Sequence, residues 1–281
     1  MIRIVSDSST LYSIEEGKER GVDILPLSVT IDNATYKENE EITTEEFINI
    51  INKGHLPITS QPAIGDVVSI YEKYPNDEII NITMADGLSG TYSTACSAKA
   101  IVENPERIEV INSKTLCGPE RYLVDTAIKL ANDGKSKDEI VSTINLMMKQ
   151  TKSFLIPNDF QYLIRGGRVS SLVGNIGEKL KLVPVMTLAE DSKKLVKFST
   201  QRTFKKAIDK ICAALIEEGI DSSYKIYISH GCAEDLAIDA KNLIDKRIPE
   251  ADIEVNILGP VFVAQGGPRA VSIQVIKRVN I

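Results

Sequence analysis

Apolar and polar positions along the first half of the chain alternate in blocks that predict strands followed by helices. Short β-rich runs at residues 2–5, 78–84 and 107–112 each lead into a polar loop. Segments with helical spacing are expected at residues 43–53, 63–74, 93–102, 120–132 and 137–150. Strands that alternate with helices favour a parallel sheet. We therefore expect an N-terminal α/β lobe, residues 1–155, with a mostly parallel sheet and helices on both faces.

The pattern changes near residue 152, where strands begin to follow one another more directly. The runs at 183–188 and 194–199 are separated by the polar turn 189–193, which is typical of a hairpin. Further strands are expected at 153–157, 224–229, 253–258 and 270–279, and helices at 172–182, 202–218 and 236–247. We expect a C-terminal α/β lobe, residues 156–281, with a mixed sheet.

Proline and hydroxyl residues sharpen several of these expectations. Pro26 lies within the strand-like run 22–31 and predicts a bend or a sheet edge there, and residues 32–41 are expected to form a loop. Thr43 and Glu46 have the spacing of a capping box. Residues 57–62 begin and end with proline, so their backbone is expected to form a defined loop.

Composition and charge narrow the classes of function. The chain has 281 residues, of which 43% are hydrophobic and 26% are charged, so it can bury a sizeable core. Its net charge of −6, without a basic run, argues against nucleic acid as a partner. We find no signal-peptide pattern or membrane-length apolar run, and the scattered cysteines fit free thiols. We expect a soluble, cytoplasmic protein without stable membrane insertion.

Residues 86–92 are the strongest candidate binding loop. They follow a predicted strand and precede a predicted helix, and they bring Ser89, Gly90 and Thr91 to a helix N-terminus. Such a terminus offers N–H donors and partial positive charge to an anion. Thr59 and Ser60 form a second hydroxyl-rich loop beside a helix start. The alternative for both loops is simple helix capping.

Other chemistries have weaker support in the sequence. His55 and His230 are the only histidines and no cysteine pair has ligand spacing, so we expect no metal. Neither a P-loop nor a dinucleotide fingerprint is present, so we expect no cofactor. Two alternatives stay open: a serine hydrolase that uses Ser89 with His230 as its base, and a protein that binds a small phosphorylated metabolite.

An ordered set of short motifs resembles the DegV family. The motifs run from the first strand onward at residues 6–9, 59–62, 88–92, 163–170, 201–203 and 205–208. The resemblance implies two α/β lobes that hold a long-chain fatty acid between them. It also implies a role as the lipid-carrying subunit of a bacterial fatty acid kinase, in which a separate ATP-dependent subunit phosphorylates the bound carboxylate for phospholipid synthesis.

The resemblance also implies roles for individual residues. Thr59, Ser60 and Ser89 would hold the carboxylate, with Gly90 close to it, while the acyl chain lies in an apolar tunnel. Three arginines would lie near the carboxylate or on the surface that meets the kinase: Arg165, Arg168 and Arg202.

The sequence departs from the family pattern near its C-terminal end. Residues 263–269 replace the usual Gly-x-His-x-Gly-Pro-Gly, so Gln265 stands where the family has a histidine linked to phosphorylation. Asn112 likewise stands where aspartate is frequent. A glutamine side chain forms hydrogen bonds but does not titrate near neutral pH. We expect fatty acid binding to survive, with coupling to a kinase weakened.

Overall fold

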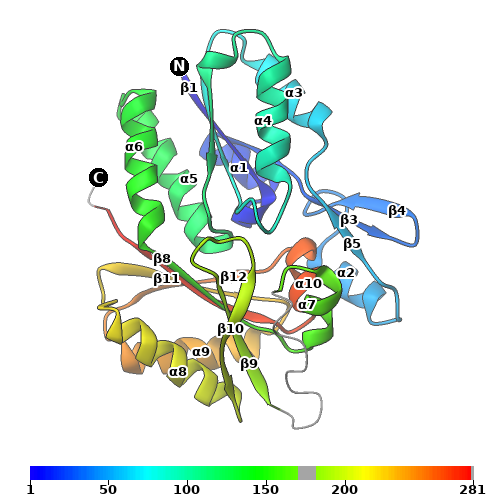
Figure 1. The fold of residues 1–281 in the computed structure, drawn as a ribbon, viewed down its shortest axis with the longest axis vertical. Helices are drawn as coiled ribbons and strands as arrows, with labels where there is room; N and C mark the ends of the chain where they lie inside the picture. Colours follow the sequence, from blue (N-terminus) through cyan, green and yellow to red (C-terminus); the bar gives the residue numbers. More distant parts are fainter. Residues whose placement is uncertain (170–181, 280–281) are drawn as a thin grey trace.

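The computed structural model describes residues 1–169 and 182–279, which form alternating layers of helices and sheets (Figure 1). Strands far apart in the sequence meet in these sheets because their apolar side chains share cores. Short 3-10 turns lie at Ser8–Thr10, Pro105–Arg107 and Met148–Gln150. Nearly all of the helix expected at residues 172–182 lies outside the described residues.

The first sheet is parallel and has the order β2 (Val22–Leu25), β1 (Ile2–Asp7), β6 (Glu78–Thr83) and β7 (Ile108–Asn112). Successive residues of its central strands enter different cores. In β6, for example, Ile80 packs on one face and Ile79 on the other. Both faces of the sheet are therefore buried, which explains the nearly continuous apolar runs of its strands.

Helices cover both faces of this sheet, as the sequence predicts. One face carries α3 (Ile64–Lys73) and α4 (Thr91–Ile101), and the other carries α5 (Cys117–Asn132) and α6 (Lys137–Met147). The short helix α1 (Ile14–Arg20) connects β1 to β2.

The second sheet is mixed, and this expectation is also confirmed. Its order is β10-β9-β8-β13-β11-β12, with β11 and β12 parallel and the other neighbours antiparallel. The expected hairpin is formed by β9 and β10. Helices α8 (Phe204–Glu217) and α9 (Glu234–Arg247) pack on one face. The strand bounds are β8 Thr151–Ile156, β9 Val183–Leu188, β10 Leu195–Gln201, β11 Tyr224–His230, β12 Asp252–Ile257 and β13 Val271–Lys277.

A small antiparallel sheet lies beside the two large ones, in the order β4 (Ala34–Lys37), β3 (Ser28–Ile31) and β5 (Ile58–Ser60). It shares a core with helices from both halves of the chain. These are α2 (Thr44–Ile51), α7 (Phe160–Gly166) and α10 (Pro260–Gly266).

The small sheet confirms some local expectations and corrects others. The chain bends between β2 and β3, where Pro26 lies, and Thr43 and Glu46 form the expected capping box. However, residues 32–41 contain strand β4, and Thr59 and Ser60 belong to strand β5 rather than to a loop. Pairing with β3 explains both corrections, because it satisfies backbone groups that local sequence alone leaves unpaired.

Helix α5 lies between the two large sheets and packs against both (Figure 1). Leu123 shares a core with Ile80 of the first sheet and Tyr227 of the second. At Gly118 a β-carbon would lie 2.1 Å from the ring of Tyr227. Glycine is therefore required for this close approach of the helix to the second sheet.

Replacement of Gly118 by alanine is expected to destabilise the protein by about 1–3 kcal/mol, because the added methyl group overlaps a fully buried ring. Chemical denaturation measures the change. Gly65→Ala in α3 is the control, since nothing lies within 4 Å of a β-carbon there. The control is expected to be neutral or stabilising by up to about 1 kcal/mol. Equal stability of the two variants would contradict this account of the interface.

Candidate functional site

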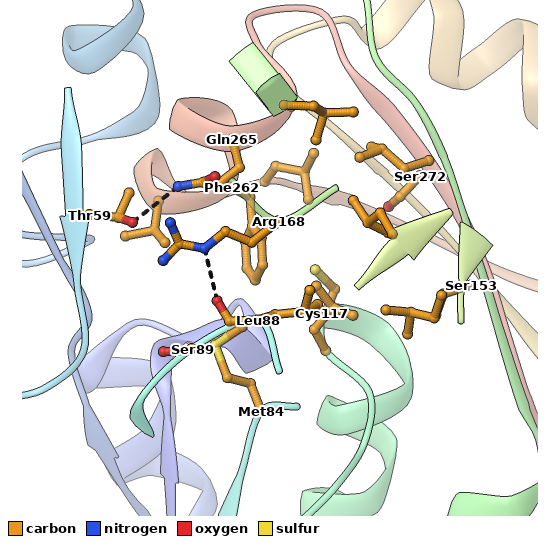
Figure 2. Close-up of a pocket in the computed structure, with 18 of the residues that line it drawn as sticks. Thr59, Met84, Leu88, Ser89, Cys117, Ser153, Arg168, Phe262, Gln265 and Ser272 are labelled. Atoms are coloured by element: carbon orange, nitrogen blue, oxygen red, sulfur yellow. Dashed lines mark hydrogen bonds between the residues drawn. The ribbon is translucent and has the colours of Figure 1, made fainter. Parts of the chain in front are cut away.

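A pocket lies between the two large sheets, and its wall is mostly apolar (Figure 2). The cavity volume is about 110 Å³. A cavity that holds a single water measures only about 10–15 Å³, so this pocket has room for a much larger molecule. Its apolar lining comes from both halves of the chain and comprises Leu27, Met84, Leu88, Leu116, Cys117, Phe154, Leu155, Leu163, Leu188, Leu195, Leu258, Val261 and Phe262.

Polar side chains gather at one end of this pocket. Gln265 Nε2 donates to Thr59 Oγ1 at 3.1 Å, and the Ser89 hydroxyl lies 2.8 Å from the Thr91 hydroxyl. Arg168 Nε donates to the carbonyl oxygen of Leu88 at 3.1 Å. Figure 2 shows Thr59, Ser89, Arg168 and Gln265 close together, although they come from four separate segments of the chain.

Arg168 places a positive charge at this polar end. A second bond, from its Nη1 to the carbonyl oxygen of Gly166 at 2.6 Å, fixes the guanidinium in place. The side chain is partly buried, and burial lowers the pKa of the guanidinium. An arginine side chain nevertheless stays charged at neutral pH. Among the described residues no carboxylate forms an ion pair with it. Within the described part of the chain, the pocket therefore presents a cation that no carboxylate neutralises.

The remaining candidate residues are distributed differently. Ser60 lines the pocket, whereas Gly90, Arg165 and Arg202 are absent from its lining. A β-carbon at Gly90 would lie 2.9 Å from the side-chain amide of Gln61, so this glycine makes room for a protein side chain. Arg165 stacks 4.5 Å from the centre of the Tyr162 ring, and Arg202 is exposed just before α8.

The capping alternative holds in part for the Ser89 hydroxyl and does not hold for the Ser60 hydroxyl. The N-cap residues of α3 and α4 are Ala63 and Gly90, and neither makes a side-chain capping bond. Ser89, one residue before the N-cap of α4, accepts from the backbone N–H of Thr91 at 3.3 Å and so satisfies one donor at the start of that helix. Ser60 lies in a strand and faces the pocket lining.

A second polar group on the pocket wall escaped prediction from the sequence. Ser153 of β8 and Ser272 and Gln274 of β13 line the pocket from the second sheet. Ser153 and Gln274 are directly opposite in the strand register. The signal was present, since Ser272 and Gln274 alternate with apolar residues along the last strand and so share one face.

The geometry required of a serine hydrolase is missing from the described residues. His230 Nδ1 accepts from the backbone of Ala233 at 3.0 Å, and His55 pairs with Asp32. Neither histidine lines the pocket, and the Ser89 hydroxyl bonds to Thr91 rather than to a base. The described residues also hold no group of three or more metal-binding side chains of the His, Cys, Asp or Glu type. No helix in that part of the chain is long and apolar enough to cross a membrane.

Three fully buried carboxyl groups lie near the start of α5: Asp7, Glu38 and Glu120. Ser9 bonds to both Asp7 and Glu120, and Ser8 donates to Glu38 Oε1 at 2.6 Å. The other Glu38 oxygen accepts from the backbone of Val261 at 3.0 Å, at the start of α10.

Burial dominates the ionisation of this cluster. It raises the pKa of Asp7, despite hydrogen bonds that favour the carboxylate. It raises the pKa of Glu38 to about 7 and that of Glu120 well above its ordinary range, with the charge of Asp7 as a further cause in both. Asp7, predicted only as part of a polar turn, thus belongs to a buried network beside the pocket.

The fold and the pocket define an α/β protein with two large sheets and a mostly apolar pocket that has a cationic group at one end. The chain belongs to the DegV family, whose family model, described as an uncharacterised protein family, matches residues 1–278. A DegV domain-containing protein of Staphylococcus aureus strain N315 is 33% identical over 98% of each chain. Protein DegV of Bacillus subtilis is 30% identical, over 97% of this chain and 98% of that one.

Solved structures agree with this assignment. The crystal structure of DegV, a fatty acid binding protein from Bacillus subtilis, has a TM-score of 0.86 and 29% identity and covers 99% of both chains. That of a fatty acid binding DegV family protein from Streptococcus agalactiae has a TM-score of 0.86, 26% identity and the same coverage.

Stability is expected to fall as pH rises through the range in which buried Glu38 loses its proton. Its pKa is higher in the folded state, about 7, than the ordinary 4.5, so the folded state binds more protons between these values. The unfolding free energy should fall with pH there, by up to about 1.4 kcal/mol per pH unit for one group, and level off above. Urea denaturation at several pH values measures this slope.

Glu38→Gln is expected to make that slope shallower, since the substituted side chain does not titrate. Exposed Glu40 offers a nearby control, and Glu40→Gln should keep the wild-type slope. An unchanged slope in Glu38→Gln would show that Glu38 is not the group responsible.

Proposed function

We propose that this protein binds a long-chain fatty acid between an N-terminal lobe, residues 1–155, and a C-terminal lobe, residues 156–281. The carboxylate is held at the polar end by Thr59, Ser60 and Ser89, with Arg168 supplying the positive charge, and the acyl chain occupies the apolar part of the pocket. Gly90 acts beside the carboxylate site by admitting the side chain of Gln61. The proposal makes the protein a lipid carrier rather than an enzyme.

The observation that carries the proposal is the position of Arg168. A partly buried guanidinium without a carboxylate partner among the described residues stands at one end of an apolar pocket. A ligand with an anionic head and an apolar body satisfies both features, because it neutralises the buried charge and fills the apolar space. The fatty acid binding described for the related proteins of Bacillus subtilis and Streptococcus agalactiae supports this choice of ligand.

The energetics favour retention of such a ligand. Each buried methylene group contributes about 0.8 kcal/mol, so a long acyl chain gains enough to stay bound through purification. A small phosphorylated metabolite would satisfy the charge of Arg168 but would leave the apolar wall without a partner. The free cysteines fit a reducing compartment, and we place the carrier in the cytoplasm.

We extend the proposal to presentation of the bound acid to a separate ATP-dependent kinase subunit. In that step a carboxylate oxygen attacks the γ-phosphorus of ATP, and the products are an acyl phosphate and ADP. The exposed arginines Arg165 and Arg202 lie outside the pocket and are available to a partner surface. Gln265 bonds to Thr59 inside the pocket, so the position at which the family has a histidine adjoins the proposed carboxylate site.

Native mass spectrometry of the purified protein is expected to show a mass excess that matches a fatty acid and disappears on denaturation.

Arg168→Gln should weaken binding of added hexadecanoic acid by about tenfold or more, since a charge-assisted bond contributes about 1.5–3 kcal/mol. Arg165→Gln removes an equal charge outside the pocket and should bind as wild type. Absence of bound lipid, together with no stabilisation by added fatty acid, would overturn the proposed function.

Kinase coupling is expected to depend on residue 265. Lipid-loaded protein is incubated with ATP and a fatty acid kinase subunit, and acyl phosphate is trapped with hydroxylamine. Gln265→His should form more acyl phosphate than wild type, because imidazole titrates near neutral pH and glutamine does not. Product from neither protein, with lipid binding intact, would overturn the kinase extension and leave the carrier function standing.

A further inference from the structure

The pocket has a second polar group that the proposed carboxylate site does not use. Ser153, Ser272 and Gln274 line the wall formed by strands β8 and β13. Figure 2 shows Ser153 and Ser272 across the pocket from Thr59 and Ser89. An unsubstituted acyl chain that fills the space between these two ends brings only C–H groups to the second one.

The side chain of Gln274 has one acceptor atom that receives no hydrogen bond from the described residues. Its Nε2 donates to the carbonyl oxygen of Leu116 and to Ser153 Oγ, both at 2.9 Å. Because a carbonyl oxygen only accepts, the bond to Leu116 fixes which end of the amide is the nitrogen. Gln274 Oε1 is then buried and accepts no hydrogen bond from any described residue. The residue as a whole is only 2% exposed. A buried acceptor left in this state is unfavourable.

Ser153 supplies the complementary group. Its Oγ accepts from Gln274 Nε2 and donates to no described residue. Ser153 thus has a hydroxyl proton to donate and Gln274 has an oxygen to accept, and the two lie opposite each other in the strand register. A hydroxyl group on a ligand donates one hydrogen bond and accepts another, so it matches this pair.

We propose that the pocket selects a fatty acid whose chain carries a hydroxyl group, bonded to Gln274 and Ser153. This inference rests on the proposed fatty acid binding and specifies its ligand class. The position of the hydroxyl along the chain is set by the span between the Arg168 end and the β8–β13 wall. A site built around a hydroxyl also discriminates against the chain that lacks one, because that chain leaves the buried acceptor unpaired.

The test compares octadecanoic acid with a set of hydroxyoctadecanoic acids that differ in hydroxyl position, by competition for the purified, delipidated protein. At least one isomer is expected to bind about tenfold more tightly than octadecanoic acid, as one added hydrogen bond in a buried site would give. The measured quantity is the ratio of the two affinities, which cancels any general change in the pocket.

Gln274→Met is expected to bring this ratio close to one, because it removes the unpaired acceptor, and Ser153→Ala is expected to lower the ratio, because it removes one of the two bonds to the hydroxyl. Ser153→Ala keeps the bond between Gln274 and Leu116 and so serves if Gln274→Met fails to fold. Ser229→Ala, which changes a buried serine on the neighbouring strand outside the pocket lining, should retain the wild-type ratio.

Two outcomes overturn the inference in different ways. If octadecanoic acid binds and no hydroxylated isomer binds more tightly, a buried water satisfies Gln274, and the proposed carrier function stands. If no fatty acid of either kind binds, the carrier function falls together with the inference.

Discussion

The structure depends on the packing of one helix, α5, between two sheets. Its first turn approaches the second sheet closely enough to exclude a side chain at Gly118. The same turn places Cys117 in the pocket wall and buries Glu120 against Ser9 of the first sheet's loop. Because interiors are close-packed, a shift of this helix would change the pocket and the buried carboxyl cluster together. The ligand site is thus a consequence of how the two sheets are joined.

The sequence predicted a helix or strand correctly where the residue pattern of that segment alone determines its structure. The β-rich run 78–84 predicted a strand, and the alternation of such runs with helical segments predicted a parallel sheet. The capping residues Thr43 and Glu46 marked a helix start for a purely local reason. Strands β4 and β5 were missed because their stability comes from pairing with β3, and β3 is separated from β5 by a whole helix.

The residues of the candidate site divide in the same way. Some are indicated by a local motif, and the role of others depends on contacts with distant segments. Hydroxyl-rich loops and the resemblance to a family drew attention to Thr59, Ser89 and Gln265, which the structure brings to one pocket. Arg168 could be noted in the sequence, but only the tertiary structure shows that no described carboxylate pairs with it. Gln274 was passed over because a polar residue in a strand usually faces solvent, and only the two-layer packing reveals that this one is buried.

The pocket draws its walls from segments at opposite ends of the chain, Leu27 among the first strands and Gln274 in the last one. Contacts of such large sequence separation form only once both sheets have assembled, so the site is completed late in folding. A ligand held there stabilises the native state and does not stabilise an early folding nucleus. Its occupancy therefore acts on the lifetime of the folded protein, by slowing unfolding, and leaves the rate of folding largely unchanged.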